Sequence, residues 1–132
     1  MIKFTNLRKE KPYLKFEEKY NTAIKANQEN IEAVCISSYS SKLNEVNSRF
    51  VNLKIINDNN FIFFSNYKSP KSEEFKDHNQ ITAIFYWNIT NVQIRIKGLI
   101  SKTSIRFNND YFFKRSEEKN ALAISSNQSK PI

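Results

Sequence analysis

The sequence predicts a small α+β domain built mainly from antiparallel strands, and three observations support this fold class. Short segments rich in β-branched and aromatic residues recur along the chain, and clusters of Asn, Asp and Ser separate them. Three stretches with helical character stand beside and between these strands. The sequence has one glycine, whereas the nucleotide-binding loops of parallel α/β proteins need several. We therefore expect a small antiparallel barrel with inserted helices rather than a doubly wound parallel sheet.

The size and composition of the chain indicate one folded unit. Its 132 residues and 15.6 kDa are typical of an ordinary domain. A hydrophobic share of 39% and an aromatic share of 14% argue against disorder in the middle of the chain. We predict a single domain over residues 1–132, in which residues 1–10 form a flexible N-terminus.

The first half of the chain predicts one helix and two strands. Apolar residues at roughly helical spacing after Pro12 predict an amphipathic helix over 13–28. Segments 31–38 and 48–56 are rich in β-branched residues and predict strands. A polar loop is expected around 38–47, between these two strands.

A hairpin and a short helix are expected next. The run Asn57-Asp58-Asn59-Asn60 tolerates the left-handed backbone region and leads directly into a strand over 61–66. Ser69 is placed as an N-cap, and Pro70 follows at the first helical position. We therefore predict a short helix that begins there and runs toward Asn79.

The second half predicts a hairpin followed by helix. Segments 80–87 and 92–103 flank the turn at 88–91, and the second segment alternates between apolar and polar residues, as a strand with one wet face does. Gly98 lies inside this strand, which suggests a bulge or a close backbone approach. Residues 109–126 are interpreted as one or two helices before a polar tail.

Charge and cysteine content limit the classes of partner and the compartment, but they do not identify a function. The net charge of +8 suits nucleic acid, an anionic membrane surface or a phosphorylated small molecule, and a solvated Lys-rich surface is the plain alternative. Cys35 is the single cysteine, so an internal disulfide is excluded, and its apolar neighbours predict a buried thiol in a reducing compartment. No stretch has the apolar character of a signal peptide or a membrane span. We expect a soluble, cytoplasmic protein.

Few side chains in this chain could perform chemistry unaided. One His and one Cys exclude a zinc site with several such ligands, and His78 is expected on the surface near a helix C-terminus. The carboxylates at 73–74 and 117–118 are adjacent in sequence, so each pair points to different faces of a helix. A reaction with a high barrier would need a cofactor, and no metal is expected.

A set of cations and hydroxyls lies at predicted strand ends and turns. Arg49 and Lys54 bracket one strand, Ser65 closes the next, and Ser69 and Lys71 begin a helix. A helix N-terminus with a nearby lysine is suited to bind a phosphate. The alternative is that Lys71 is a routine residue of a first helical turn.

The order of several segments resembles the pyridoxamine 5′-phosphate oxidase family, whose fold is the FMN-binding split β-barrel. The segments are RFVNLK, FIFFSNYKSPKSEEF, ITAIFYW, VQIRIKG, DYFFKR and NQSKPI. They stand in the family's order and spacing from about residue 31 to the end of the chain, and the helix before them also fits. No single motif is diagnostic, but six in the correct order are strong evidence.

The resemblance implies FMN held at the interface of a homodimer. Arg49 and Lys71 would hold the FMN phosphate, Ser65 would donate a hydroxyl, and Gln93 would reach the flavin ring. The implied cofactor-binding residues are Arg49, Phe50, Val51, Asn52, Leu53, Lys54, Phe64, Ser65, Lys71, Gln93, Gln128 and Ser129.

The resemblance also implies a small phosphorylated substrate. Lys54, Tyr111 and Arg115 match the family positions that hold the substrate phosphate, and Lys119 stands where the family has a serine. The implied reaction is hydride transfer from C4′ of pyridoxamine or pyridoxine 5′-phosphate to the flavin. Oxygen then reoxidises the flavin, and pyridoxal 5′-phosphate is the product.

The spacing of the two cations in the segment RFVNLK limits their roles. Arg49 and Lys54 are five residues apart, so a regular strand directs them to opposite faces. They cannot both clamp one phosphate. We therefore assign Arg49 to the phosphate of FMN and Lys54 to that of the substrate.

The chain also departs from the family pattern. Pro70 replaces an arginine that donates to the phosphate, and Glu117 stands where an arginine is usual. Family members continue past the Gln-Ser pair through strands with a Trp and an Arg-x-His group, whereas this sequence stops at Ile132.

One alternative is thus an FMN- or pyridoxal-phosphate-binding protein without oxidase activity. Another is a basic nucleic-acid-binding module, which predicts aromatic and basic residues together on one exposed sheet face. We rank it last and expect neither nucleic acid nor membrane as partner.

Overall fold

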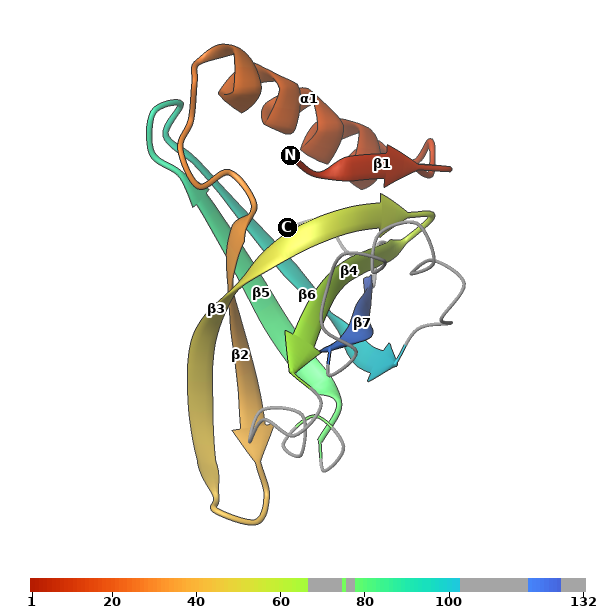
Figure 1. Cartoon of the computed structure of the whole chain (residues 1–132), viewed down its shortest axis with the longest axis vertical. Helices are drawn as coiled ribbons and strands as arrows, with labels where there is room; N and C mark the ends of the chain where they lie inside the picture. The colour runs from red at the N-terminus through yellow and green to blue at the C-terminus, as the bar shows by residue number, and fades with distance from the viewer. Residues whose placement is uncertain (67–74, 76–77, 103–118, 127–132) are drawn as a thin grey trace.

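The computed structural model describes residues 1–66, 75, 78–102 and 119–126. Their elements, in chain order, are β1 (Lys3–Thr5), α1 (Lys11–Lys25), β2 (Ala33–Ser40), β3 (Glu45–Asn57), β4 (Asn60–Asn66), β5 (Gln80–Trp87), β6 (Val92–Lys102) and β7 (Lys119–Ser126). The strands wrap around a common centre, and α1 lies across one end of them (Figure 1).

Six of the described strands close into an antiparallel barrel. Neighbouring strands follow the order β3, β2, β5, β6, β7 and β4, and β4 pairs again with β3. Closure depends on the length of β3, which pairs with β2 over Glu45–Asn52 and with β4 from Leu53 onward. The register shifts between Leu53 and Ile55, where β3 changes its partner. The predicted fold class, a split β-barrel of antiparallel strands, is confirmed.

Asparagine and aspartate shape the tight turns, as the sequence predicts. Asp58 joins β3 to β4 with φ of 56°, and Asn91 ends the β5–β6 turn with φ of 53°. Asn44 has φ of 52° in the β2–β3 turn. Short polar side chains tolerate this left-handed region better than other non-glycine residues do.

Helix α1 packs an aromatic core into the end of the barrel. The buried side chains of the helix are Tyr13, Phe16, Tyr20 and Ala23. The Phe16 ring meets Phe61, Phe85 and Trp87 edge-on, with centroids 5.5, 5.5 and 5.7 Å apart. This arrangement matches the predicted amphipathic helix.

Three local predictions were wrong. Residues 119–126 form strand β7 rather than helix, because hydrogen bonding to β4 on one edge and β6 on the other outweighs the helix-forming tendency of Ala and Leu. The loop expected around 38–47 shrinks to a four-residue turn at 41–44, because Tyr39 and Ser40 pair with Val46 and Glu45.

The third wrong prediction concerns the N-terminus. Residues 3–5 form β1 in parallel with the end of β3, instead of a flexible segment. Ile2 is buried, and its N–H donates to the Tyr20 hydroxyl at 2.8 Å. These contacts dock the segment on α1 and β3. The short helix predicted from Ser69 lies outside the described residues, apart from Phe75, which is helical and buried.

Gly98 lies where β6 and β7 approach closely, as the sequence suggests. A Cβ added there would be 2.3 Å from the carbonyl oxygen of Ser125. We predict that Gly98→Ala lowers the free energy of unfolding by about 2 kcal/mol, because backbone must shift to make room. Urea denaturation measures this change, and Ser101→Ala, at an exposed position of the same strand, serves as the control. Equal stability of Gly98→Ala and wild type would contradict the close approach.

Candidate functional site

The strand that the sequence assigns to the flavin lies in the barrel wall, in the middle of β3. Arg49, Val51 and Leu53 alternate with Phe50 and Asn52, and only the second pair is exposed. Leu53 is buried, whereas Phe50 is 73% exposed. The residues of β3 alternate between the two faces up to Leu53, and Lys54 lies within the register shift that follows.

The guanidinium of Arg49 is held by groups on the inner side of the barrel. Its Nη1 donates to the Ser38 hydroxyl at 2.7 Å and to the Ile36 carbonyl at 3.3 Å. The guanidinium carbon also lies 5.5 Å from the centre of the Phe75 ring. Ser38 is buried on the inner face of β2, which it shares with Val34, Ile36 and Ser40. These contacts fix the position of the cation.

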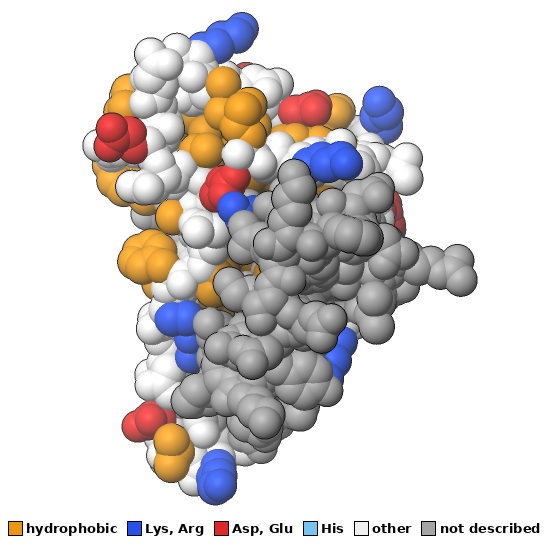
Figure 2. Space-filling model, in the orientation of Figure 1, with side chains coloured by type: hydrophobic (Ala, Val, Ile, Leu, Met, Phe, Trp, Pro, Cys, Tyr) orange, Lys and Arg blue, Asp and Glu red, His pale blue; other side chains and the backbone are white. Residues whose placement is uncertain are grey.

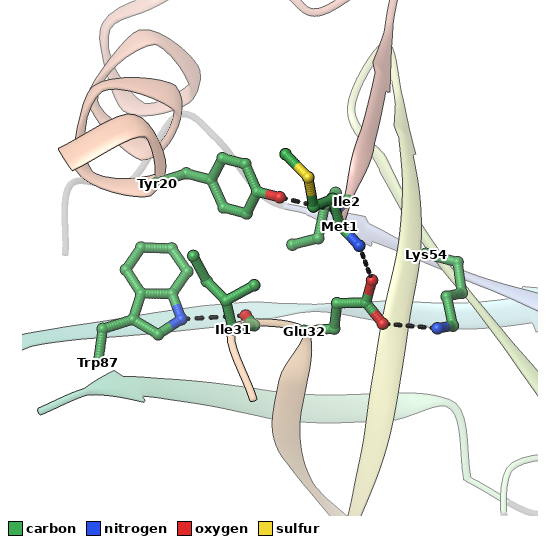
Figure 3. A network of polar contacts seen from close by, with 7 residues as sticks. All are labelled: Met1, Ile2, Tyr20, Ile31, Glu32, Lys54 and Trp87. Carbon is green, nitrogen blue, oxygen red and sulfur yellow. Dashed lines mark hydrogen bonds and ion pairs between the residues drawn. The ribbon is translucent and has the colours of Figure 1, made fainter. Parts of the chain in front are cut away.

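Lys54 has a different environment, at the opposite end of the flavin-assigned strand. Its Nζ lies 2.5 Å from Oε1 of Glu32, and the two side chains are only 17% and 16% exposed. The other carboxylate oxygen accepts from the amino group of Met1 (Figure 3). The Leu53 N–H donates to the Glu32 carbonyl at 2.8 Å, which fixes the two strands at this point.

The charge state of Glu32 follows from these contacts. Burial raises the pKa of its carboxyl, whereas hydrogen bonds and charges from Lys54 and the amino group of Met1 lower it, and the net pKa is below the ordinary value. Glu32 is therefore ionised at neutral pH.

Apolar and basic side chains share the outer face of the sheet. The strand registers place Phe50, Cys35, Ile84 and Arg95 side by side in one row across β3, β2, β5 and β6. Tyr86, which is 57% exposed, lies on the same face. In Figure 2, hydrophobic side chains reach the surface along the left edge, on the side of β2, β3 and β5 in Figure 1. We call Phe50, Cys35, Ile84, Tyr86 and Arg95 the outer patch.

The outer patch corrects one expectation from the sequence. Cys35 is partly exposed rather than buried, because it points to the outer face of β2. Tyr86 is exposed as well, whereas its neighbours Phe85 and Trp87 are buried. An exposed face with aromatic and basic residues, the feature expected of a nucleic-acid-binding module, is therefore present.

The remaining predicted site residues lie in separate places or outside the described residues. Gln93 is exposed opposite Tyr86, on the outer face and not beside Arg49. Phe64 packs partly buried against a small cluster that includes Ile62. Ser65 and Lys119 belong to the paired strands β4 and β7. The predicted residues outside the described ones are Lys71, Tyr111, Arg115, Gln128 and Ser129.

Sequence reasoning missed Glu32 and Ser38. The alternation of β2 could have marked Ser38, since it is a hydroxyl on the face shared by Val34 and Ile36. No local signal marks Glu32, because its partner lies 22 residues away across the sheet. His78 is partly buried, with its ring 5.4 Å from that of Tyr39.

The part of the chain that the structure describes shows neither a metal-binding cluster nor a membrane-spanning helix. No three His, Cys, Asp or Glu side chains there gather in a way that could hold a metal ion. No helix there is long and apolar enough to cross a membrane.

The fold and the strand from Arg49 to Lys54 define a protein of the split-barrel class, and comparisons agree. A phenazine-biosynthesis protein, PhzG from Burkholderia lata, matches with a TM-score of 0.73 at 24% identity, over 80% of this chain and 52% of that one. A pyridoxamine 5′-phosphate oxidase-related, FMN-binding protein from Nostoc punctiforme matches with a TM-score of 0.70 at 8% identity, over 89% and 82%. No family model matches the chain.

Relatives found by sequence indicate a narrower family than the structural neighbours do. The pyridoxine/pyridoxamine 5′-phosphate oxidase of Colwellia psychrerythraea is 39% identical over 101 residues, which are 76% of this chain and 46% of the relative. Several others of the same name are about 31% identical over 92% of this chain. The chain is therefore a homologue of the pyridoxine/pyridoxamine 5′-phosphate oxidases, as its motifs indicate. It spans about half the length of these relatives.

The environment of Glu32 predicts a pH-dependent contribution to stability. A carboxyl whose pKa is lowered by folding stabilises the fold above its unfolded pKa, and the contribution is lost as the pH falls through the folded pKa. Glu32→Gln should therefore be less stable than wild type at about pH 6, and the difference should shrink toward about pH 3. Urea denaturation across this range measures it. A difference that stays constant with pH would show that the ion pair contributes nothing.

Proposed function

We propose that this chain is an FMN-dependent oxidoreductase that forms pyridoxal 5′-phosphate from pyridoxamine or pyridoxine 5′-phosphate with oxygen as electron acceptor. The observation on which the proposal rests is the strand Arg49–Lys54, which combines homology to the oxidases with two cations held in separate environments. Bound FMN would supply the hydride acceptor, which no side chain of the chain can replace.

The surroundings of Arg49 support a role in phosphate binding. A buried hydroxyl and a carbonyl orient the guanidinium before any ligand arrives, so little side-chain entropy would be lost on binding. Arginine binds phosphate through parallel N–H donors, and one edge of the fork can remain on Ser38 while another meets a ligand. These residues fit the phosphate of FMN.

Lys54 supports a second phosphate position, for the substrate. It lies five residues further along β3 than Arg49, at the register shift where the strand changes partner. A substrate phosphate at Lys54 and an FMN phosphate at Arg49 would then occupy different places, as a transfer between two bound molecules requires.

The outer patch supports a second copy of the chain as partner. Phe50 and Tyr86 expose large aromatic surfaces on the same sheet face as Arg95. Exposed aromatic side chains and arginine are enriched at protein–protein interfaces. A twofold dimer would bring Gln93 of one chain toward the flavin-assigned strand of the other, which would account for its separation from Arg49.

A second candidate function is an FMN- or pyridoxal-phosphate-binding protein without oxidase activity. Its supporting observation is the Glu32–Lys54 ion pair, which places a carboxylate on the cation assigned to the substrate. Peroxide production from pyridoxamine 5′-phosphate by FMN-loaded protein separates the two candidates. Turnover supports the oxidase, and FMN binding without peroxide supports the binding protein.

Arg49 provides a mutational test of the flavin assignment. Arg49→Gln should weaken FMN binding by about 30-fold, because charge-assisted hydrogen bonds to phosphate contribute roughly 2 kcal/mol. Quenching of flavin fluorescence on titration measures the dissociation constant. Lys42→Gln removes one positive charge from the exposed β2–β3 turn and should leave the affinity within about twofold. Equal effects of the two substitutions would show that Arg49 acts only through net charge.

The dimer is tested at the outer patch. Phe50→Asp should convert the protein to a monomer, because it places a carboxylate in an apolar interface. Sedimentation velocity measures the oligomeric state. Leu14→Asp alters an exposed apolar residue of α1 and should leave the dimer intact. A wild-type monomer that binds single-stranded DNA with strong salt dependence would instead assign the patch to nucleic acid.

A further inference from the structure

Glu32 and Lys54 form a notably enclosed ion pair in the part of the chain that the structure describes. Their side chains are 16% and 17% exposed, whereas each of the pairs of Arg8 joins side chains that are at least 35% exposed. Glu32 directly precedes β2, and Lys54 lies at the register shift of β3. The backbone bond between Leu53 and Glu32 fixes the two side chains opposite each other.

We propose that Glu32 is a specificity-determining residue that weakens the binding of phosphate groups at Lys54. The inference rests on the proposed function, because that function places a substrate phosphate at Lys54. The resemblance to the oxidase family gives Glu32 no role. In this proposal, Glu32 sets the preference between phosphorylated and unphosphorylated forms of the ligand.

Glu32 and a phosphate group would compete for one cation, the ammonium group of Lys54. An ammonium group has three donors, and in this structure Glu32 accepts one of them at 2.5 Å. A phosphate must either share Lys54 with the carboxylate or displace it. In both cases the phosphate lies near a negative charge in a partly buried setting, where water screens the repulsion poorly. An unphosphorylated ligand meets no such repulsion.

The carboxylate is charged at neutral pH, as its contacts require. The hydrogen bonds from Lys54 and the amino group of Met1 lower the pKa of Glu32 despite its burial. Replacement by glutamine keeps the size and one acceptor oxygen of the side chain, exchanges the other oxygen for an NH2 donor, and removes the negative charge. Glu32→Gln is therefore the matched substitution.

The experiment compares three probes. The phosphorylated probe is 4-deoxypyridoxine 5′-phosphate, which has no oxygen at C4′ and so cannot be oxidised there. The unphosphorylated probe is 4-deoxypyridoxine, and inorganic phosphate is the third. Dissociation constants are measured by isothermal titration calorimetry with FMN-loaded wild type, Glu32→Gln, Glu32→Asp and the control Glu29→Gln. Glu29 is exposed and lies three residues before Glu32.

We expect Glu32→Gln to bind the phosphorylated probe and inorganic phosphate about fivefold more tightly than wild type. The unphosphorylated probe and the Glu29→Gln control should change by less than about twofold. Glu32→Asp, which withdraws the carboxylate by one methylene, should give a smaller gain and serves if the glutamine variant fails to fold. The gain should vanish when Lys54→Gln is added, because the effect acts through Lys54.

Several outcomes overturn the inference. Phosphate binding that is unchanged or weaker in Glu32→Gln does so, as does a gain that survives Lys54→Gln or equals that of Glu29→Gln. Failure of the proposed function is distinct. A protein that takes up no FMN, but whose Glu32→Gln variant still binds inorganic phosphate more tightly, contradicts the proposed function and supports the role of Glu32.

Discussion

The change of partner along β3 is the constraint on which the rest of the structure depends. Residues 45–52 of this strand pair with β2, and residues 53–57 pair with β4 and β1. The barrel closes only because one strand serves both sides. Arg49, on the inner side, precedes this shift, and Lys54, which meets Glu32, lies within it. The irregularity that closes the barrel therefore also carries one of the two cations of the candidate site.

Local chemistry predicted the parts of the fold that short-range rules govern. The turn around Asp58, the alternation of β6 and the amphipathic face of α1 each follow from side chains within a few residues of one another. The barrel class followed from the number of such strands and from the near absence of glycine. These features needed no knowledge of long-range contacts.

Long-range pairing explains what the sequence did not predict. Strand β7 contains Ala, Leu and Asn, and it is a strand because both of its edges meet neighbours far away in the sequence. Strand β1 is ordered by β3, about fifty residues later. The Glu32–Lys54 pair likewise joins residues that only the sheet register brings together. The resemblance thus identified Arg49 and Lys54 as candidate site residues. The side chains that surround them could be found only from the structure.

Preorganisation of Arg49 links this architecture to the proposed chemistry. Ser38 orients Arg49 before a ligand binds, whereas Lys54 is held by Glu32, with which a phosphate would have to compete. The absorbance spectrum of the purified protein, before and after addition of FMN and removal of the excess, tests the central claim most directly. The account predicts retained flavin bands at about one FMN per chain. Protein that stays colourless after this treatment would contradict it.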